Sequence, residues 1–314
     1  MKPQINIIHK TFWIITLIVF IILLVPSLVQ DGMFLDGVTY SAISKNLANN
    51  NGTIWKPFYT KTLYPEFFEH PPLFFFIQSI FFKILGNSLY VERLFSLITA
   101  IISLLGIKLI WELFFNKSNL KYYSWMPVFL WIITPIIFWS YKNNMLENLL
   151  TVFILFSVIF SLKALIQNKI FYLLLSGLFI LFAFLTKGFV GLFPLVIIII
   201  YWITINKISF SKTILYTGIL LLFPIVLLFL LFLIEPKSLN NITQYFNIQL
   251  IPSIKNNREL ADYRFYILVR LLNELIPIVI ITLVITLINK MIDEKLMTDE
   301  SFINTFAKRI GPKI

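Results

Sequence analysis

The sequence predicts an all-α protein that crosses a membrane several times. Of its 314 residues, 59% are hydrophobic and 13% are charged, and the mean hydropathy is +0.87, whereas soluble domains carry about 25% charged residues. Apolar windows of about 18 to 25 residues recur along the chain, each long enough to cross a hydrocarbon core of about 30 Å. These windows lack the alternation of barrel strands, so helices are the predicted spanning elements.

The apolar windows predict about eight transmembrane helices. The first window follows a basic N-terminal segment, is longer than the apolar region of a signal peptide and lacks a small-residue cleavage site, so we interpret it as a retained anchor. The predicted spans are residues 12–29, 90–115, 124–141, 146–166, 170–185, 189–205, 213–234 and 265–289.

Two further helices are predicted in the long first outer loop, residues 30–89. Residues 37–48 place Tyr40, Ile43 and Leu47 at helical spacing, which is typical of an amphipathic helix on a membrane surface. The segment "PPLFFFIQSIFFKILG", residues 71–86, is apolar but too short to span, and it is interpreted as an interfacial helix. We therefore expect a transmembrane module over 1–289, with outer loops at 30–89 and 235–264, and a polar cytoplasmic tail over 290–314.

Charge and cysteine content narrow the function classes. The formal net charge is +11 and cysteine is absent, so thiolate nucleophiles and disulfides are excluded. The positive charge is densest in short loops, which predicts a cytoplasmic N-terminus and anionic membrane lipids as neighbours. No basic, aromatic-rich recognition module accompanies it, so we expect no nucleic-acid partner.

This topology gathers the polar residues at the outer face of the membrane. Asp36, Glu69 and His70 lie in the first outer loop, Glu147 begins the fourth span, and Lys187 follows the fifth. Their convergence depends on the interfacial interpretation of residues 71–86, because a further span there would place Glu147 and Lys187 across the membrane from Glu69. The sequence thus predicts one polar site.

The acidic residues of the first loop each allow a structural and a functional interpretation. Asp36 suits a helix N-cap, and it equally suits a general base whose pKa is raised by partial desolvation at the membrane surface. Glu69 and His70 form either a solvated loop or the rim of a wet cavity. Glu69 is also the candidate ligand if a divalent metal is bound, and that alternative stays open.

The remaining site residues are open to two interpretations in the same way. Glu147 in a first helical turn suits the helix dipole. Lys187 is either a snorkelling lysine or, next to Gly188 and Gly191, part of a phosphate site. Arg258 and Arg264 in the late loop either clamp a phosphate or contact lipid headgroups.

Four ordered motifs resemble polytopic GT-C class glycosyltransferases, the family that includes protein O-mannosyltransferases and the aminoarabinose transferases of lipid A. The motifs are "DGVTYSAISKNLANNNGTIWKP", "FFEHPPLFFFIQSIFFKILGNSLYVERLFSLI", "MLENLLTVF" and "LTKGFVGLFPLVI". The resemblance implies a GT-C-like bundle in the inner membrane. It also implies a polyprenyl-phosphate sugar donor, a lipid, glycan or protein acceptor at the outer face, and inversion at the anomeric carbon of a hexosyl or pentosyl group.

The resemblance also implies roles for individual residues. Asp36 matches the aspartate that activates the acceptor, and Tyr40 the tyrosine one turn later. Glu69 matches the glutamate of the loop motif, with His70 where a lysine is common, and Lys187 matches the lysine that binds donor phosphate. Glu147 falls where relatives often have aspartate. This chain departs from the family at two positions. Gly37 stands where relatives usually have glutamate, and Asn247 lies near the position where the aminoarabinose transferases have a histidine that helps to hold zinc.

Two other function classes remain compatible with the residues. A lipid-linked-sugar carrier or flippase would need polar groups on both faces of the membrane or through it. A non-catalytic assembly subunit would be active only with a partner.

Overall fold

A computed structural model describes residues 2–255 and 266–296, and the chain divides into two compact units, Met1–Leu260 and Ala261–Ile314. The first unit holds all the helices that build the site. Within the second unit, the described part is one helix, α13 (Tyr266–Leu296), which contains Pro277. The predicted tail over 290–314 continues this helix to Leu296, and the rest of it lies outside the described residues.

Long apolar helices form the body of the first unit. By length and composition, five described helices are able to cross a membrane, or six if one bent pair is a single span, so the predicted count of about eight is not confirmed. The polytopic all-α prediction itself is confirmed. The body consists of α1 (Lys2–Val29), α4 (Tyr90–Phe114), η1 (Asn119–Tyr123), α5 (Trp125–Ile132), α6 (Pro135–Lys142), α7 (Leu146–Gln167), α8 (Ile170–Lys187), η2 (Gly188–Val196), α9 (Ile197–Ile205) and α10 (Phe210–Ile234).

One predicted span is bent, and the chain reverses direction between two others. The helical segments 119–132 and 135–142 meet at a 70° bend, where Pro135 begins α6, because a proline cannot donate to the preceding turn. The apolar run 170–205 is continuous in composition, but a Cβ at Gly191 would lie 2.3 Å from the carbonyl carbon of Ala183. Residues eight apart in a straight helix are about 12 Å apart, so the chain folds back after Lys187.

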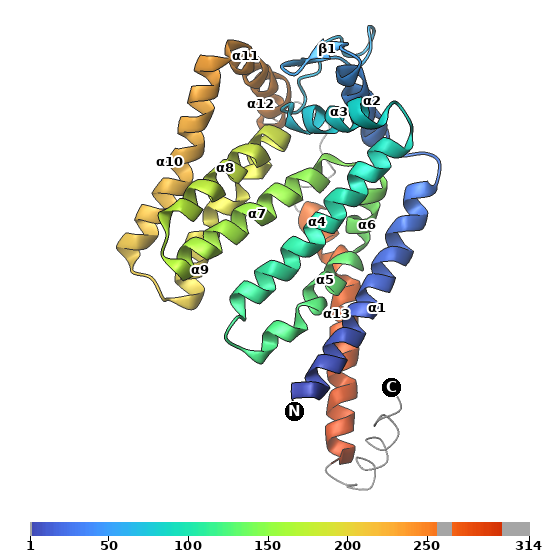
Figure 1. The fold of residues 1–314 in the computed structure, drawn as a ribbon, viewed down its shortest axis with the longest axis vertical. Coiled ribbons are helices and arrows are strands. Elements are labelled where there is room, and N and C mark those ends of the chain that lie inside the picture. Colours follow the sequence, from blue (N-terminus) through green and yellow to red (C-terminus); the bar gives the residue numbers. More distant parts are fainter. Residues whose placement is uncertain (1, 256–265, 297–314) are drawn as a thin grey trace. The chain divides into compact units, whose positions relative to one another are not determined.

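Short elements gather at one end of the unit. Figure 1 shows α2 (Leu35–Ala48), the β1–β2 hairpin (Gly52–Thr53 and Lys56–Pro57) and α3 (Leu73–Leu85) at the end of the bundle that also carries α11 (Pro236–Tyr245). η3 (Phe246–Leu250), a π-helix, and α12 (Ile251–Ile254) follow α11. The apolar α3 has 13 residues, too few to span, as the interfacial interpretation predicts.

An aromatic core holds these short elements on the long helices. Tyr40 of α2, Phe67 of the loop, Phe74 and Phe75 of α3 and Phe95 of α4 are all buried in one cluster. Phe67–Phe75 and Phe74–Phe95 are edge-to-face pairs with ring centroids 5.5 Å apart, a favourable arrangement for aromatic rings. The core therefore fixes α2 and α3 relative to α4 and the start of α7.

Buried hydroxyl groups join α7 to α8. The Ser176 hydroxyl lies 2.9 Å from that of Ser157 and 2.8 Å from that of Ser161, and all three residues are fully buried. Small hydroxyl residues let helices approach closely within a membrane while satisfying each other's polar groups. This contact holds the two helices whose ends carry Glu147 and Lys187.

Candidate active site

Five separate segments line one cavity of about 500 Å³ at the end of the first unit, called here the site cavity. It is lined by one face of α2, the first outer loop, the start of α7, the end of α8 and η3. The structure brings together six of the eight residues singled out in the sequence, namely Asp36, Tyr40, Glu69, His70, Glu147 and Lys187. Arg258 and Arg264 lie outside the described residues.

Asp36 lies in the first turn of α2 and is partly buried. The N-cap position belongs to Phe34, and no side chain caps the helix, so the capping interpretation of Asp36 is not observed. Burial raises the pKa of the Asp36 carboxyl, the negative charge of Glu147 raises it further, and Lys187 opposes both. A carboxylate with a raised pKa is a stronger proton acceptor than a solvated aspartate.

Tyr40 lies one helical turn after Asp36 and presents a neutral hydroxyl to the cavity. Burial, followed by the charges of Asp36, Glu147 and Glu69, raises the pKa of Tyr40 well above its usual range. Its hydroxyl lies 3.2 Å from Nε2 of His70. Tyr40 therefore orients His70 through a hydrogen bond whose direction depends on the imidazole tautomer.

The two glutamates of the loop have different surroundings. The Tyr64 hydroxyl donates to Oε1 of Glu69 at 3.1 Å, and both residues line the cavity. Glu66 instead forms a 2.6 Å ion pair with Lys56 between exposed side chains and does not line the cavity. In the described part of the chain, no three His, Asp or Glu side chains cluster to hold a metal, so Glu69 stays a single candidate ligand.

An ion pair joins the ends of α7 and α8. Nζ of Lys187 donates to Oε1 of Glu147, while Oε2 of Glu147 is buried and has no hydrogen-bond partner among the residues that the structure describes. Lys187 is the last residue of α8 and directly precedes η2. Its side chain is thus directed to a carboxylate in the cavity and does not reach outward as a snorkelling lysine would.

The turn after Lys187 is held by Tyr245 of α11. Gly188 has φ +71°, and a Cβ there would lie 2.0 Å from the Tyr245 hydroxyl oxygen. The same hydroxyl forms a hydrogen bond with the backbone of Phe189. Only glycine fits both the left-handed conformation and the close approach, which explains the glycine that follows Lys187.

The loop between α6 and α7 contributes contacts that sequence reasoning missed. Oδ1 of Asn143 accepts from the backbone N–H of Phe34 at 2.7 Å, immediately before α2. Oδ1 of Asn144 accepts from Gln78 of α3 at 2.7 Å and from Ser96 of α4 at 3.4 Å. The only sequence signal is the asparagine pair between two apolar runs, which is equally typical of a solvated turn.

Gly37 makes the approach of α2 to this loop possible. A Cβ at Gly37 would lie 1.8 Å from the backbone oxygen of Asn143, closer than any real contact. The glutamate usual in the family at this position would therefore not fit the present packing. Gly37 is the residue that places Asp36 beside the loop leading to Glu147.

Arg93 of α4 ties the same two segments together. Its guanidinium donates to the backbone oxygens of Gly32 at 2.7 Å and Gln30 at 3.2 Å, and also to that of Lys142. The first two precede α2 and the third ends α6. A planar guanidinium has five donors in a rigid fork, so it holds these three carbonyls in one geometry.

Gln249 of η3 is a further residue that sequence reasoning missed. It lines the site cavity, and its Oε1 is buried without a hydrogen-bond partner among the described residues. Asn247, near the position of the zinc-holding histidine in relatives, is exposed. The π-helix that turns Gln249 inward leaves no local signal in the sequence, although such helices often mark functional sites.

The arrangement suits transfer to a hydroxyl group in the presence of an anion. A partly desolvated carboxylate can take a proton, a lysine can stabilise a developing negative charge, and the tyrosine, imidazole and amide groups can orient hydroxyl groups. The site lies at the ends of membrane-spanning helices, where amphiphilic substrates present their headgroups.

Comparison with known proteins identifies similar sequences and folds. A family model described as dolichyl-phosphate-mannose-protein mannosyltransferase matches residues 69–232. Undecaprenyl phosphate-alpha-4-amino-4-deoxy-L-arabinose arabinosyl transferase from Wigglesworthia glossinidia brevipalpis is 29% identical over 221 residues, which are 67% of this chain and 37% of that protein.

Two solved structures share the fold. The structure of ArnT from Cupriavidus metallidurans bound to undecaprenyl phosphate superposes with a TM-score of 0.63 at 14% identity, over 85% of this chain and 48% of that one. The archaeal oligosaccharyltransferase AglB from Archaeoglobus fulgidus, in complex with an inhibitory peptide and a dolichol-phosphate, gives 0.55 at 15% identity, over 97% and 39%. The predicted GT-C-like architecture is confirmed, and this chain spans less than half the length of each relative.

Proposed function

The chain belongs to the dolichyl-phosphate-mannose-protein mannosyltransferase family, and we propose that it transfers a sugar from a polyprenyl-phosphate donor to a hydroxyl group. The observation that carries the proposal is the site cavity, where Asp36 with its raised pKa lies near the Glu147–Lys187 ion pair. The donor class is supported by the undecaprenyl phosphate bound in the ArnT structure and the dolichol-phosphate bound in the AglB structure. The proposal is compatible with a divalent metal bound at Glu69.

In the proposed reaction, Asp36 accepts the proton of the acceptor hydroxyl. The acceptor oxygen attacks the anomeric carbon as the bond from that carbon to the donor phosphate oxygen breaks, so configuration is inverted. The polyprenyl phosphate leaves with the bonding electron pair, and Lys187 stabilises its negative charge together with Arg258 and Arg264. Tyr40, Glu69, His70 and Glu147 would position the acceptor and the sugar.

We place this reaction at the outer face of the inner membrane, with the N-terminus in the cytoplasm. Lysine-rich short loops support that orientation under the positive-inside rule. The acceptor would be a hydroxyl of a lipid, a glycan or a protein, and the transferred group a hexosyl or pentosyl sugar. Each acceptor class can reach a cavity that opens at the membrane surface.

The proposal is tested by transfer from a panel of radiolabelled polyprenyl-phosphate sugars, using purified protein in detergent with membrane lipids and peptides as acceptors. We expect transfer from one donor, reduced about 100-fold or more in Asp36→Asn and Lys187→Ala. The matched controls Glu66→Gln and Lys56→Ala remove an exposed ion pair outside the cavity and should transfer normally.

The opposite results would reject the proposal. Undiminished transfer in Asp36→Asn would remove Asp36 from the mechanism. Absence of transfer from every donor, with donor lipid still bound, would instead indicate a carrier or a subunit that needs a partner.

A further inference from the structure

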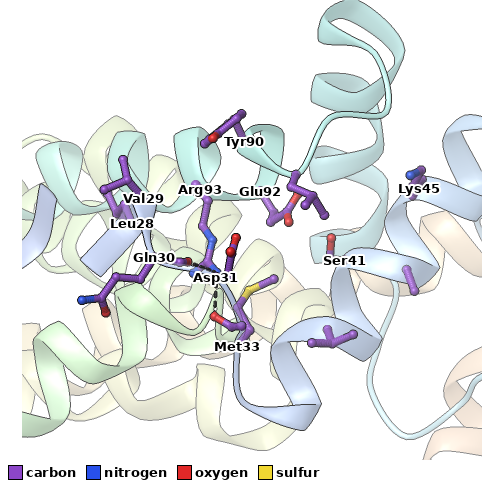
Figure 2. A pocket seen from close by; sticks show the side chains of 14 residues that line it. Leu28, Val29, Gln30, Asp31, Met33, Ser41, Lys45, Tyr90, Glu92 and Arg93 are labelled. Atoms are coloured by element: carbon purple, nitrogen blue, oxygen red, sulfur yellow. Dashed lines mark hydrogen bonds between the residues drawn. The ribbon is translucent and has the colours of Figure 1, made fainter. Parts of the chain in front are cut away.

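A second cavity lies on the opposite face of α2 from the site cavity. It measures about 330 Å³ and is called here the headgroup pocket. Asp36, Thr39 and Tyr40 of α2 line the site cavity, whereas Val38, Ser41 and Lys45 line the headgroup pocket. Its other walls are the end of α1 with the loop after it and the start of α4 (Figure 2).

The base of this pocket carries a buried carboxylate. Glu92, in the first turn of α4, is only 2% exposed, and its carboxylate forms hydrogen bonds with its own backbone N–H and with the Ser41 side chain. Among the described residues it forms no ion pair within 4.0 Å. A carboxylate has about four acceptor sites, so Glu92 can accept further hydrogen bonds from a ligand.

The neighbouring arginine does not fill that capacity. Arg93 lies close enough to attract both Glu92 and Asp31 electrostatically, but its donors point at the backbone oxygens of Gln30, Gly32 and Lys142. A buried carboxylate normally has its charged partner at contact distance. A cationic donor group from a ligand would complete the coordination of Glu92, with the exposed Asp31 as a second acceptor.

The rim of the pocket points to an amphiphile. Val29 is 65% exposed, Leu89 72% and Tyr90 67%, and they lie where α1 ends and α4 begins. These ends mark the boundary between hydrocarbon and headgroups, where tyrosine is enriched. An acyl chain can pack on this rim while a polar headgroup enters the pocket.

The opposite wall supplies a positive charge. Lys45 extends from α2, and its Nζ donates to the backbone oxygen of Asn87 at 3.1 Å. Its ammonium group also attracts Glu92 electrostatically, and among the described residues two of its three N–H donors have no hydrogen bond and can serve an anion. The pocket therefore presents the buried carboxylate of Glu92, the exposed carboxylate of Asp31 and the ammonium group of Lys45, which together match a headgroup that carries both an amine and a phosphate.

We propose that the headgroup pocket binds a membrane phospholipid with a primary amine, of the phosphoethanolamine class. The ligand ammonium donates to Glu92 and Asp31, its phosphate lies toward Lys45, and an acyl chain covers the apolar rim. The volume is at the lower end of the range of about 300 to 1,000 Å³ that ligand sites occupy. Bound lipid would brace α2, whose other face carries Asp36.

The test compares two lipids that differ only in methylation of the amine. Delipidated full-length protein in detergent receives phosphatidylethanolamine or phosphatidylcholine with identical chains, and Tm and retained lipid, by native mass spectrometry, are measured. A quaternary ammonium has no N–H to donate, so we expect phosphatidylethanolamine to raise Tm by at least about 3 °C more. Water-soluble O-phosphoethanolamine tests whether the headgroup alone is sufficient for binding. If it raised Tm more than the lipid does, the ligand would be a soluble phosphoethanolamine compound and not a membrane phospholipid.

Two variants and a matched control locate the site. Glu92→Gln should abolish the preference for the primary amine, while Glu112→Gln, the same change at the other end of α4, should keep it. Val38→Trp leaves the charges intact and fills the pocket, so it should release the lipid even if Glu92→Gln fails to fold. Equal effects of both lipids on the wild type, or a preference that survives Val38→Trp, would refute the proposal. Neither readout requires sugar transfer.

Discussion

At the scale of single residues, the surroundings of Asp36 decide how the candidate site responds to pH. Burial and the charge of Glu147 raise the pKa of the Asp36 carboxyl, and Lys187 lowers it. Only the deprotonated form can accept a proton from the acceptor. Activity should therefore fall as pH falls through this raised pKa, at a higher pH than an ordinary aspartate would give.

Neutralising Glu147 and neutralising Lys187 should shift the acidic limb of the pH–activity profile in opposite directions. Glu147→Gln removes a negative charge, which lowers the pKa of Asp36 and shifts the limb to lower pH. Lys187→Met removes a positive charge, which raises the pKa and shifts the limb to higher pH. The measurement is kcat/KM for sugar transfer against pH in both variants and in wild type.

Glu66→Gln is the control for this pair, because it removes a carboxylate that lies outside the cavity. Its profile should overlay that of wild type. Shifts of the same sign in Glu147→Gln and Lys187→Met would contradict the assignment of Asp36 as the titrating base.

At the scale of elements, the loop between α6 and α7 determines where α2 lies. The backbone oxygen of Asn143 occupies the space where a Cβ of Gly37 would be, at 1.8 Å. Gly37→Ala should therefore displace α2 and destabilise the protein by about 1 to 3 kcal/mol, the usual range for overpacking. The measurement is Tm in detergent, together with the rate of sugar transfer.

Gly218 of α10 provides the matched control, since a Cβ there meets no atom of the described part of the chain within 4 Å. Gly218→Ala should leave Tm unchanged or raise it, because alanine has the higher helix propensity by about 1 kcal/mol. Equal Tm values for Gly37→Ala and Gly218→Ala would show that α2 is not held by this contact.

The Arg93 contacts lead to a prediction about geometry. Arg93→Met keeps apolar bulk but removes the charged donor of three part-buried hydrogen bonds to backbone oxygens, which weakens the connection between the segments they join. Because those oxygens belong to the segments before α2 and at the end of α6, Asp36 and Glu147 should lose their alignment. We expect kcat to fall more than KM changes, with partial recovery in Arg93→Lys.

A steady-state comparison of wild type, Arg93→Met and Arg93→Lys measures this effect. Nζ of the half-buried Lys142 donates to Oε1 of Gln30, so Lys142→Met serves as a control for local charge. A fall in Tm without any change in kcat would indicate that Arg93 stabilises the fold without positioning the site.

At the scale of the whole molecule, the absence of cysteine permits a direct test of orientation. Single substitutions Lys56→Cys, in the β1–β2 hairpin, and Lys207→Cys, between α9 and α10, introduce the only thiols. Membrane-impermeant maleimide should label the first in intact spheroplasts and the second only after permeabilisation. Labelling of both from one side, or the reverse pattern, would contradict the proposed topology.

Local composition explains which helices the sequence predicted correctly. The spans 12–29, 90–115, 146–166 and 213–234 agree with described helices to within a few residues, because the partition of apolar residues into a membrane depends on local composition. The short α3 was predicted for the same reason. The turn after Lys187, between the predicted spans 170–185 and 189–205, is also observed. The bend at Pro135 was not predicted, since it divides an apolar run whose composition is uniform.

The sequence by itself determined that the chain is a polytopic helical membrane protein, and it named the polar residues that gather in the site cavity. Only the tertiary structure decided how they are held. The hydrogen bond from Phe34 to Asn143 joins residues that are 109 positions apart in the sequence, and the hydrogen bond from Arg93 to Gly32 joins residues that are 61 positions apart. An asparagine in a turn has the same local signature whether it binds water or another segment. Hydropathy is a property of each segment alone, whereas these hydrogen bonds exist only once the packed helices bring distant segments together.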